Sequence, residues 1–173
     1  MDIRPLEPGD REALERFIGR VPEGDRTFFK EDVEALQVID AWTQPGPARA
    51  VAVADGEVVG YVAVVPLHGW SNHVGEVRLI VDPGHRGRGV GRGLARRAVL
   101  EAVALDLRKM VVEVVADHAP TIAMFRALGF DPEALLTDHV RDKSGALRDL
   151  MILAQSVEAQ WSAMSVAGIA DEL

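Results

Sequence analysis

The sequence of 173 residues contains no cysteine. Disulfide bonds, thiolate metal ligands and a cysteine nucleophile are therefore excluded. No stretch of 18 uncharged apolar residues occurs, so we expect no membrane-spanning helix and no membrane partner. The N-terminal residues include no apolar segment of the kind found in secretory signal peptides, and we expect a cytoplasmic location.

The chain has fewer basic residues than acidic ones. Asp and Glu number 27 against 19 Lys and Arg, which gives a formal net charge of −8. Nucleic-acid binding requires a basic face that neutralises phosphates, so we expect no nucleic-acid partner. Apolar residues make up 48% of the chain, which is typical of a globular protein. We expect one domain over residues 1–155 and a helical tail over residues 156–173, packed on that domain or on a dimer partner.

The pattern of apolar residues predicts strands that alternate with helices. Asp10 is a suitable helix N-cap, and Asp55-Gly56 between two β-rich runs predicts a tight hairpin. The other strands are expected at residues 3–4, 74–81 and 110–116 and in a second hairpin around residues 143–145. The helices are expected from residue 10 onward, over about 31–42, over 94–107 and over 120–128. This order predicts an α/β fold with a mixed sheet of about seven strands flanked by helices.

One segment contrasts with the acidic chain. Residues 83–97, PGHRGRGVGRGLARR, carry five arginines and no acid, and they lie between a predicted strand and a predicted helix. Glycines let a ligand approach the backbone, and the N–H groups of a first helical turn favour an anion. Glycine at every second position does not fit the G-x-G-x-x-G dinucleotide pattern, and the G-K-[ST] of a P-loop is absent. The pattern favours an anion site over a glycine turn with solvated arginines.

The spacing Arg86-x-x-Gly89-x-Gly91 resembles the Q/R-x-x-G-x-G/A signature of the GNAT family of N-acetyltransferases. A second segment, VEVVADHAPTIAMFRALGF at residues 112–130, is similar to the later strand–helix region of that family. The two motifs occur in the order found in the family, and the resemblance covers about residues 3–155. It implies a GNAT fold, in which the fourth and fifth strands of the sheet splay apart.

The resemblance also implies acetyl-CoA as the acyl-donor cosubstrate, without a metal. The backbone amides of the loop would bind its diphosphate, at Arg86, Gly87, Arg88, Gly89, Val90 and Gly91. Arg92, farther along the helix, would contact the 3′-phosphate or face solvent. Leu79, Ile80 and Val81 would pair their main-chain groups with the pantetheine arm, as an added strand does.

Two positions depart from the family pattern. His118 replaces an asparagine that is common after the fifth strand, and it can still contact the pantetheine arm. Phe125 replaces a tyrosine that protonates the leaving thiolate in many members. A phenyl ring cannot donate a proton, so another group or water must serve, or acid catalysis is dispensable.

Direct acyl transfer requires a neutral amine, so a base must remove a proton from the acceptor. Glu76 is the leading base, although the equivalent residue in some family members falls on Gly75, and one residue changes the strand face. The alternative is that Glu76 pairs with Arg78, with Arg86 or with a backbone group. His118 is the second catalytic candidate, because imidazole titrates near neutrality, or else it is a solvated loop contact.

Two functions follow from these expectations. The first is an acetyl-CoA-dependent N-acetyltransferase that transfers the acetyl group directly to a primary amine of a small molecule or of a protein lysine or N-terminus. The second is a non-catalytic acetyl-CoA-binding regulatory or sensor module, which the phenylalanine at position 125 keeps open. Many members of the family dimerise, so a homodimer is expected.

Overall fold

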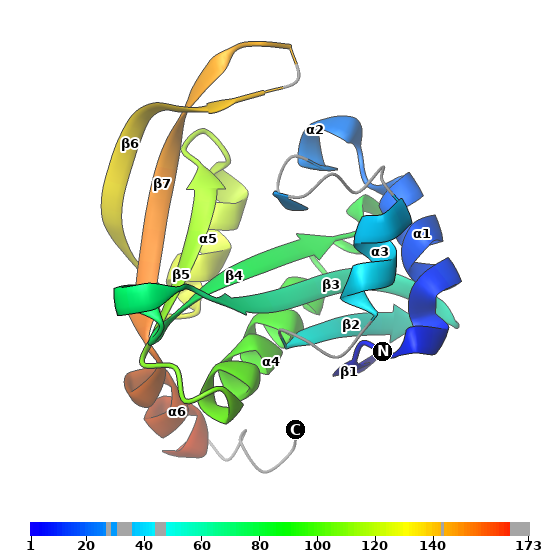
Figure 1. Cartoon of the computed structure of the whole chain (residues 1–173), viewed down its shortest axis with the longest axis horizontal. Helices are drawn as coiled ribbons and strands as arrows, with labels where there is room; N and C mark the ends of the chain where they lie inside the picture. Colours follow the sequence, from blue (N-terminus) through cyan, green and yellow to red (C-terminus); the bar gives the residue numbers. More distant parts are fainter. Residues whose placement is uncertain (27–28, 31–35, 44–47, 143, 167–173) are drawn as a thin grey trace.

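The computed structural model describes residues 1–26, 29–30, 36–43, 48–142 and 144–166. A single seven-stranded sheet runs through it in the order β1-β2-β3-β4-β5-β7-β6 (Figure 1). The strands are β1 (Asp2–Pro5), β2 (Arg49–Ala54), β3 (Glu57–Pro66), β4 (Val74–Val81), β5 (Lys109–Val115), β6 (Asp131–Arg141) and β7 (Leu147–Ser156). The pair β4–β5 is parallel and the other neighbours are antiparallel, so the predicted mixed sheet is confirmed.

Helices cover both faces of the sheet. They are α1 (Arg11–Arg20), α2 (Glu23–Arg26), α3 (Leu36–Trp42), α4 (Val90–Ala104), α5 (Ala119–Ala127) and α6 (Val157–Val166). Buried residues of α1 and α3 form one core cluster with one face of β2 and β3, and those of α4 and α5 form a second cluster with the opposite face. In the second cluster α6 lies beside α4, and Val157 is buried there (Figure 1). The last part of the predicted tail, residues 167–173, lies outside the described residues.

The helix after the glycine-rich segment begins earlier than the sequence indicates. It was expected over residues 94–107, but α4 spans Val90–Ala104. Glycines disfavour helix interiors, which hides this start in the sequence. The helix ends before Asp106, whose φ of 52° is not helical. Of the helix expected over 31–42, residues 31–35 lie outside the described residues and α3 covers the remainder.

The predicted N-cap position of Asp10 is confirmed, but its side chain makes no capping hydrogen bond to α1. Its carboxylate instead accepts two hydrogen bonds from Arg4, at 2.6 and 2.7 Å, and one from the amide of Glu7 at 2.9 Å. Both carboxylate oxygens are thus engaged by the Arg4 guanidinium on β1 in a charge-assisted bidentate pair.

The predicted splay of the sheet is present between β4 and β5. The two strands pair only at Val74 with Lys109, Gly75 with Met110 and Glu76 with Val111. Beyond this point β4 continues to Val81 and β5 continues to Val115, and Figure 1 shows the two strands diverging. The split opens toward the loop that follows β4, so a ligand between the strands can reach that loop.

Candidate functional site

The open edge of β4 presents main-chain groups at alternate residues. Asp82 donates its amide hydrogen to Val59 at 2.9 Å, and Leu67 donates to Val74 at 2.9 Å, which fixes the antiparallel register of β4 with β3. In such a pair, alternate residues point their N–H and C=O groups at the partner strand. The groups of Ile80 are therefore directed toward β3, whereas those of Leu79 and Val81 face the split. Three residues were predicted to pair their main-chain groups with the pantetheine arm. In this register Leu79 and Val81 have main-chain groups available for such pairing, whereas those of Ile80 are used in the pairing of β4 with β3.

A cavity of about 720 Å³ fills the split. Its walls come from the diverging halves of β4 and β5, the loop after β4, the start of α4 and the first turns of α5. Asp25 and Lys30, from the segment between α1 and α3, complete the lining. The lining residues of the loop and of α4 are Arg86, Gly87, Gly89, Gly91 and Arg92.

The glycines of the loop fall into two kinds. Gly87 and Gly89 have φ values of 73° and 85°, which other residues adopt at a cost, and a Cβ built on either would meet open space. Gly91 and Gly93 have ordinary helical φ values, but a Cβ would meet the Met124 sulfur at 2.8 Å in the first case and the tip of Ile3 in the second. The first two glycines therefore shape the loop toward the cavity, and the last two permit close packing of α4.

Gly89 also leaves the start of α4 without a side-chain cap. The first N–H groups of a helix have no intrahelical partners, and they carry the positive end of the helix dipole. The loop thus directs amides toward a cavity that Arg86 and Arg92 also line. Arg88 is exposed and is not among the lining residues, and the side chain of Val90 is buried in the core, so each could contribute its amide alone.

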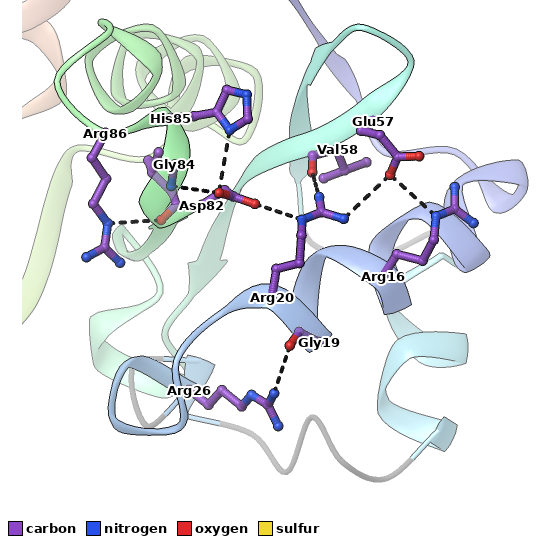
Figure 2. Close-up of polar contacts among 11 residues, drawn as sticks. Arg16, Gly19, Arg20, Arg26, Glu57, Val58, Asp82, Gly84, His85 and Arg86 are labelled. Carbon is purple, nitrogen blue, oxygen red and sulfur yellow. Dashed lines mark hydrogen bonds and ion pairs between the residues drawn. The ribbon is translucent and has the colours of Figure 1, made fainter.

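Asp82 holds the base of this glycine loop, by which we mean residues 82–92 (Figure 2). Its carboxylate accepts hydrogen bonds from the Gly84 amide at 2.9 Å and from Arg20 Nε at 2.8 Å. Arg20 also donates to the Val58 carbonyl at 2.6 Å, which ties the loop to α1 and β3. Partial burial opposes ionisation, but Arg20, the Gly84 amide and His85 outweigh it and lower the pKa of Asp82. Sequence reasoning missed this residue, although Asp-Pro-Gly is a turn signal.

Arg86 is already engaged by neighbours. Its Nε donates to the Val81 carbonyl at 3.2 Å, and its Nη2 lies 2.5 Å from a carboxylate oxygen of Asp25. Asp25 lies on α2, so this ion pair joins the short helix to the glycine loop. Farther along α4, Arg97 pairs with Glu101 at 2.5 Å.

Four charged side chains meet beside the cavity, and three of them, Lys30, Arg78 and Glu113, line it. Glu76 is 8% exposed, and Lys30 donates hydrogen bonds both to Glu76 on β4 and to Glu113 on β5. Arg78 Nη2 approaches the second oxygen of Glu76 at 3.3 Å. We call Glu76 and Glu113 the acidic pair. Lys30 was not identified from the sequence, because nothing in its local pattern indicates a contact 46 and 83 residues away.

The strand face of Glu76 is settled by its neighbours. A Cβ on Gly75 would meet Leu107 at 2.5 Å, on the α4 side of the sheet, so Glu76 faces the opposite side with Ile80. Burial favours the neutral carboxylic acid, but the hydrogen bond and charge of Lys30, with the charge of Arg78, lower the pKa of Glu76 overall. Glu76 is therefore an ionised carboxylate at neutral pH. Its expected ion pair with Arg78 is present, but Arg86 pairs with Asp25 instead.

The two remaining candidates lie on or beside α5. His118 occupies the N-cap position, lines the cavity and places Nδ1 2.6 Å from the Thr121 hydroxyl, which also lines it. Phe125 is 1% exposed and packs edge-on against Phe130 with ring centroids 5.3 Å apart. The wall at position 125 is thus apolar, and the polar groups at this side of the cavity are those of His118 and Thr121.

The described ranges contain no group of three His, Asp or Glu residues placed to hold a metal ion. No helix in this part of the chain has the length and hydropathy that a bilayer crossing requires.

Comparison with known proteins gives consistent matches. The sequence profile of the Acetyltransferase (GNAT) family matches residues 14–130. An uncharacterized N-acetyltransferase of Escherichia coli K12 is 29% identical over 157 residues, which is 86% of this chain and 94% of that protein. Streptothricin acetyltransferase of Streptomyces lavendulae is 36% identical over 155 residues, covering 75% of this chain and 80% of that protein. A Salmonella typhimurium protein whose structure contains its cofactor acetyl-CoA superposes with a TM-score of 0.74, at 25% identity, over 91% of this chain and 94% of that one.

Proposed function

The chain belongs to the GNAT family of acetyltransferases, and from this premise we propose that it transfers the acetyl group of acetyl-CoA directly to a primary amine. The observation that carries the proposal is the split between β4 and β5, whose cavity is also lined by the glycine loop at the uncapped start of α4. A diphosphate suits the loop, and an amide-bearing arm suits the open edge of β4.

The residues present fit this donor in charge and in shape. The lining of the cavity of about 720 Å³ includes residues of the loop, of both strands of the split and Glu113 of the acidic pair. Arg86 and Arg92 add positive charge beside the loop amides, where the anionic part of the donor would lie. Leu79 and Val81 supply the main-chain groups that face the arm, whereas Ile80 supports the strand from the opposite core.

The acceptor would be activated at the acidic pair, which together with Lys30 we call the acceptor end of the site. When bound, acetyl-CoA supplies a thioester carbonyl with a thiolate leaving group. Glu76 is the proposed base because it is ionised, buried and beside the split, although its lowered pKa makes proton removal an uphill step. A main-chain N–H on the open edge of β4 is the proposed hydrogen-bond donor to the carbonyl oxygen. His118 is the second proposed base, and Phe125 takes no part in proton transfer.

A small-molecule amine is the favoured acceptor. The relative from Streptomyces lavendulae is named for streptothricin, a small molecule. Two carboxylates at the acceptor end of the cavity suit a cationic ammonium group, and they already hold the one on Lys30. A protein amine and a homodimer stay predictions, as does the cytoplasmic location.

Two measurements test the proposal. Titration calorimetry with acetyl-CoA is expected to show binding in the micromolar range, and a panel of primary amines is expected to release free thiol from acetyl-CoA. Arg141→Gln is the matched control, since this exposed arginine on β6 is not among the cavity-lining residues and its loss is expected to leave binding within about twofold. Binding weaker than millimolar would contradict the proposal. Tight binding with no thiol release from any amine would instead support the sensor module.

A further inference from the structure

Lysine is rare in this chain. Sixteen of the 19 basic residues are arginines, and the three lysines are Lys30, Lys109 and Lys143. A guanidinium forms better ion pairs with carboxylates than an ammonium does, yet the position between Glu76 and Glu113 carries lysine. What distinguishes lysine from arginine chemically is that its amine can become a neutral nucleophile.

The amine of Lys30 lies in the place that the proposed reaction requires for its acceptor. Lys30 lines the same cavity as the glycine loop, and its Nζ is hydrogen-bonded to Glu76, the proposed base. Its side chain is 30% exposed, so the amine is neither sealed in the core nor free in solvent. The backbone of Lys30 has a φ of 58°, a conformation that costs a non-glycine residue about 1–2 kcal/mol. The fold therefore holds this residue against local strain, with its amine at the split.

We infer that Lys30 is a site of self-acetylation: the enzyme transfers an acetyl group from acetyl-CoA to its own Lys30 Nζ. The inference rests on the proposed function. A bond forms between Nζ and the acetyl carbonyl carbon, and the bond from that carbon to sulfur breaks, with its electron pair leaving on the thiolate. The ammonium loses two protons. One passes through Glu76 to solvent, and the other ends on the thiol of coenzyme A.

Acetylation changes the charge at the acceptor end. The product is a neutral amide, so the cation shared by Glu76 and Glu113 is removed, and Arg78 remains as a partner of Glu76. The acidic pair then has a vacant place for the ammonium group of an external acceptor. Self-acetylation would in this way convert a site occupied by its own lysine into one with unsatisfied negative charge.

The test is peptide mapping by mass spectrometry after incubation of the full chain with acetyl-CoA and no external amine. Lys109 is an internal reference, because its side chain is 35% exposed and also pairs with a carboxylate, that of Glu133 at 2.5 Å, but it is not among the cavity-lining residues. We expect Lys30 to be acetylated at least tenfold faster than Lys109. An intramolecular reaction also predicts a first-order rate that does not change with protein concentration.

Two variants sharpen the result. Glu76→Gln is expected to slow modification of Lys30 by at least tenfold without changing the slow modification of Lys109, and circular dichroism confirms that the variant is folded. Lys30→Arg keeps the cation between the carboxylates and is expected to abolish the fast phase of thiol release seen without an acceptor.

The outcomes separate the inference from the proposed function. Modification of Lys30 no faster than that of Lys109, in a protein that binds acetyl-CoA and acetylates an external amine, would overturn the inference and leave the function standing. Failure to bind acetyl-CoA would overturn both. A Lys30 rate that rises in proportion to protein concentration would replace self-acetylation by transfer between molecules, which also contradicts the inference.

Discussion

The loop end of the cavity is one continuous segment, residues 82–92, whereas the acceptor end joins Lys30, Glu76 and Glu113 from three separate elements. The first presents mainly backbone amides, set by glycine conformations and by one buried aspartate. The second presents side chains of opposite charge that pair with one another. A ligand site built from backbone amides tolerates substitution of most side chains around it. A site built from side chains can instead change the acceptor that it binds through a single substitution.

This contrast predicts that the two ends fail in different ways when mutated. Substitutions at the loop end should weaken acetyl-CoA binding, and those at the acceptor end should slow the chemical step while leaving that binding nearly unchanged. Each prediction below tests one side of the contrast.

The largest effect is expected from Glu76→Gln. Removal of a general base lowers kcat by about 10²- to 10⁴-fold. The amide keeps the shape of the side chain, so the Kd of acetyl-CoA should change by less than about twofold. Steady-state kinetics with the best amine of the panel and calorimetry measure the two quantities.

If kcat is unchanged, Glu76 is not the base. The matching substitution His118→Gln, at the second candidate, then tests whether the proton is removed from the α5 side of the cavity instead.

Gly89→Ala should raise the Kd of acetyl-CoA by about tenfold. Its φ of 85° costs an alanine about 1–2 kcal/mol, and the new methyl group would enter the open space in front of the loop. Gly93→Ala is the matched control four residues later, where the Cβ would meet the tip of Ile3 rather than the cavity. That control should lower the thermal stability and leave Kd unchanged; equal Kd values for both variants would contradict the assignment of the loop.

Asp82→Asn should lower the free energy of unfolding by about 1–2 kcal/mol at pH 7, because Arg20 loses its ionised partner. The pKa of Asp82 is lowered in the folded state, so its charge stabilises the fold above the ordinary aspartate pKa of about 3.9, and that contribution disappears as the pH falls through the lowered value. Urea denaturation should therefore show the difference between wild type and variant shrinking below about pH 4. A difference that persists unchanged at pH 2 would mean that the charge of Asp82 is not its source.

The smallest effect is expected at Asp25. Its carboxylate lies 2.5 Å from Arg86 and competes with a diphosphate for the same guanidinium. Exposed ion pairs contribute about 0.2–1 kcal/mol, so Asp25→Asn should tighten acetyl-CoA binding by about two- to fivefold. Calorimetry at low and high salt measures this, since the gain should be smaller at high salt. Weaker binding in the variant would show that Asp25 supports the loop instead of competing with its ligand.

The fold and the loop end could be predicted from the sequence because their signals are local. Asp55-Gly56 gave the hairpin, and both residues have the positive φ that such a turn requires. Arg86, Gly89 and Gly91 identified the loop by spacing alone. The start of α4 could not be predicted, since the glycines that disfavour a helix are retained there for close packing.

The acceptor end was predictable only in part. Glu76 could be named from its strand, but its partner Lys30 comes from a distant segment and reaches it through the tertiary fold. The side-chain partner of Asp10 could not be named for a related reason, because Arg4 on β1 engages its carboxylate. Side chains that meet through long-range contacts carry no mark in a single sequence.

The open edge of β4 has one more consequence, which concerns the exchange of amide hydrogens with solvent. The amides of Arg78 and Ile80 are directed toward β3 by the register, while those of Leu79 and Val81 face the split. Neighbouring residues of one strand should therefore exchange at alternating slow and fast rates. A bound ligand that pairs with the edge would slow the fast set alone, so the strand itself reports whether the split is filled.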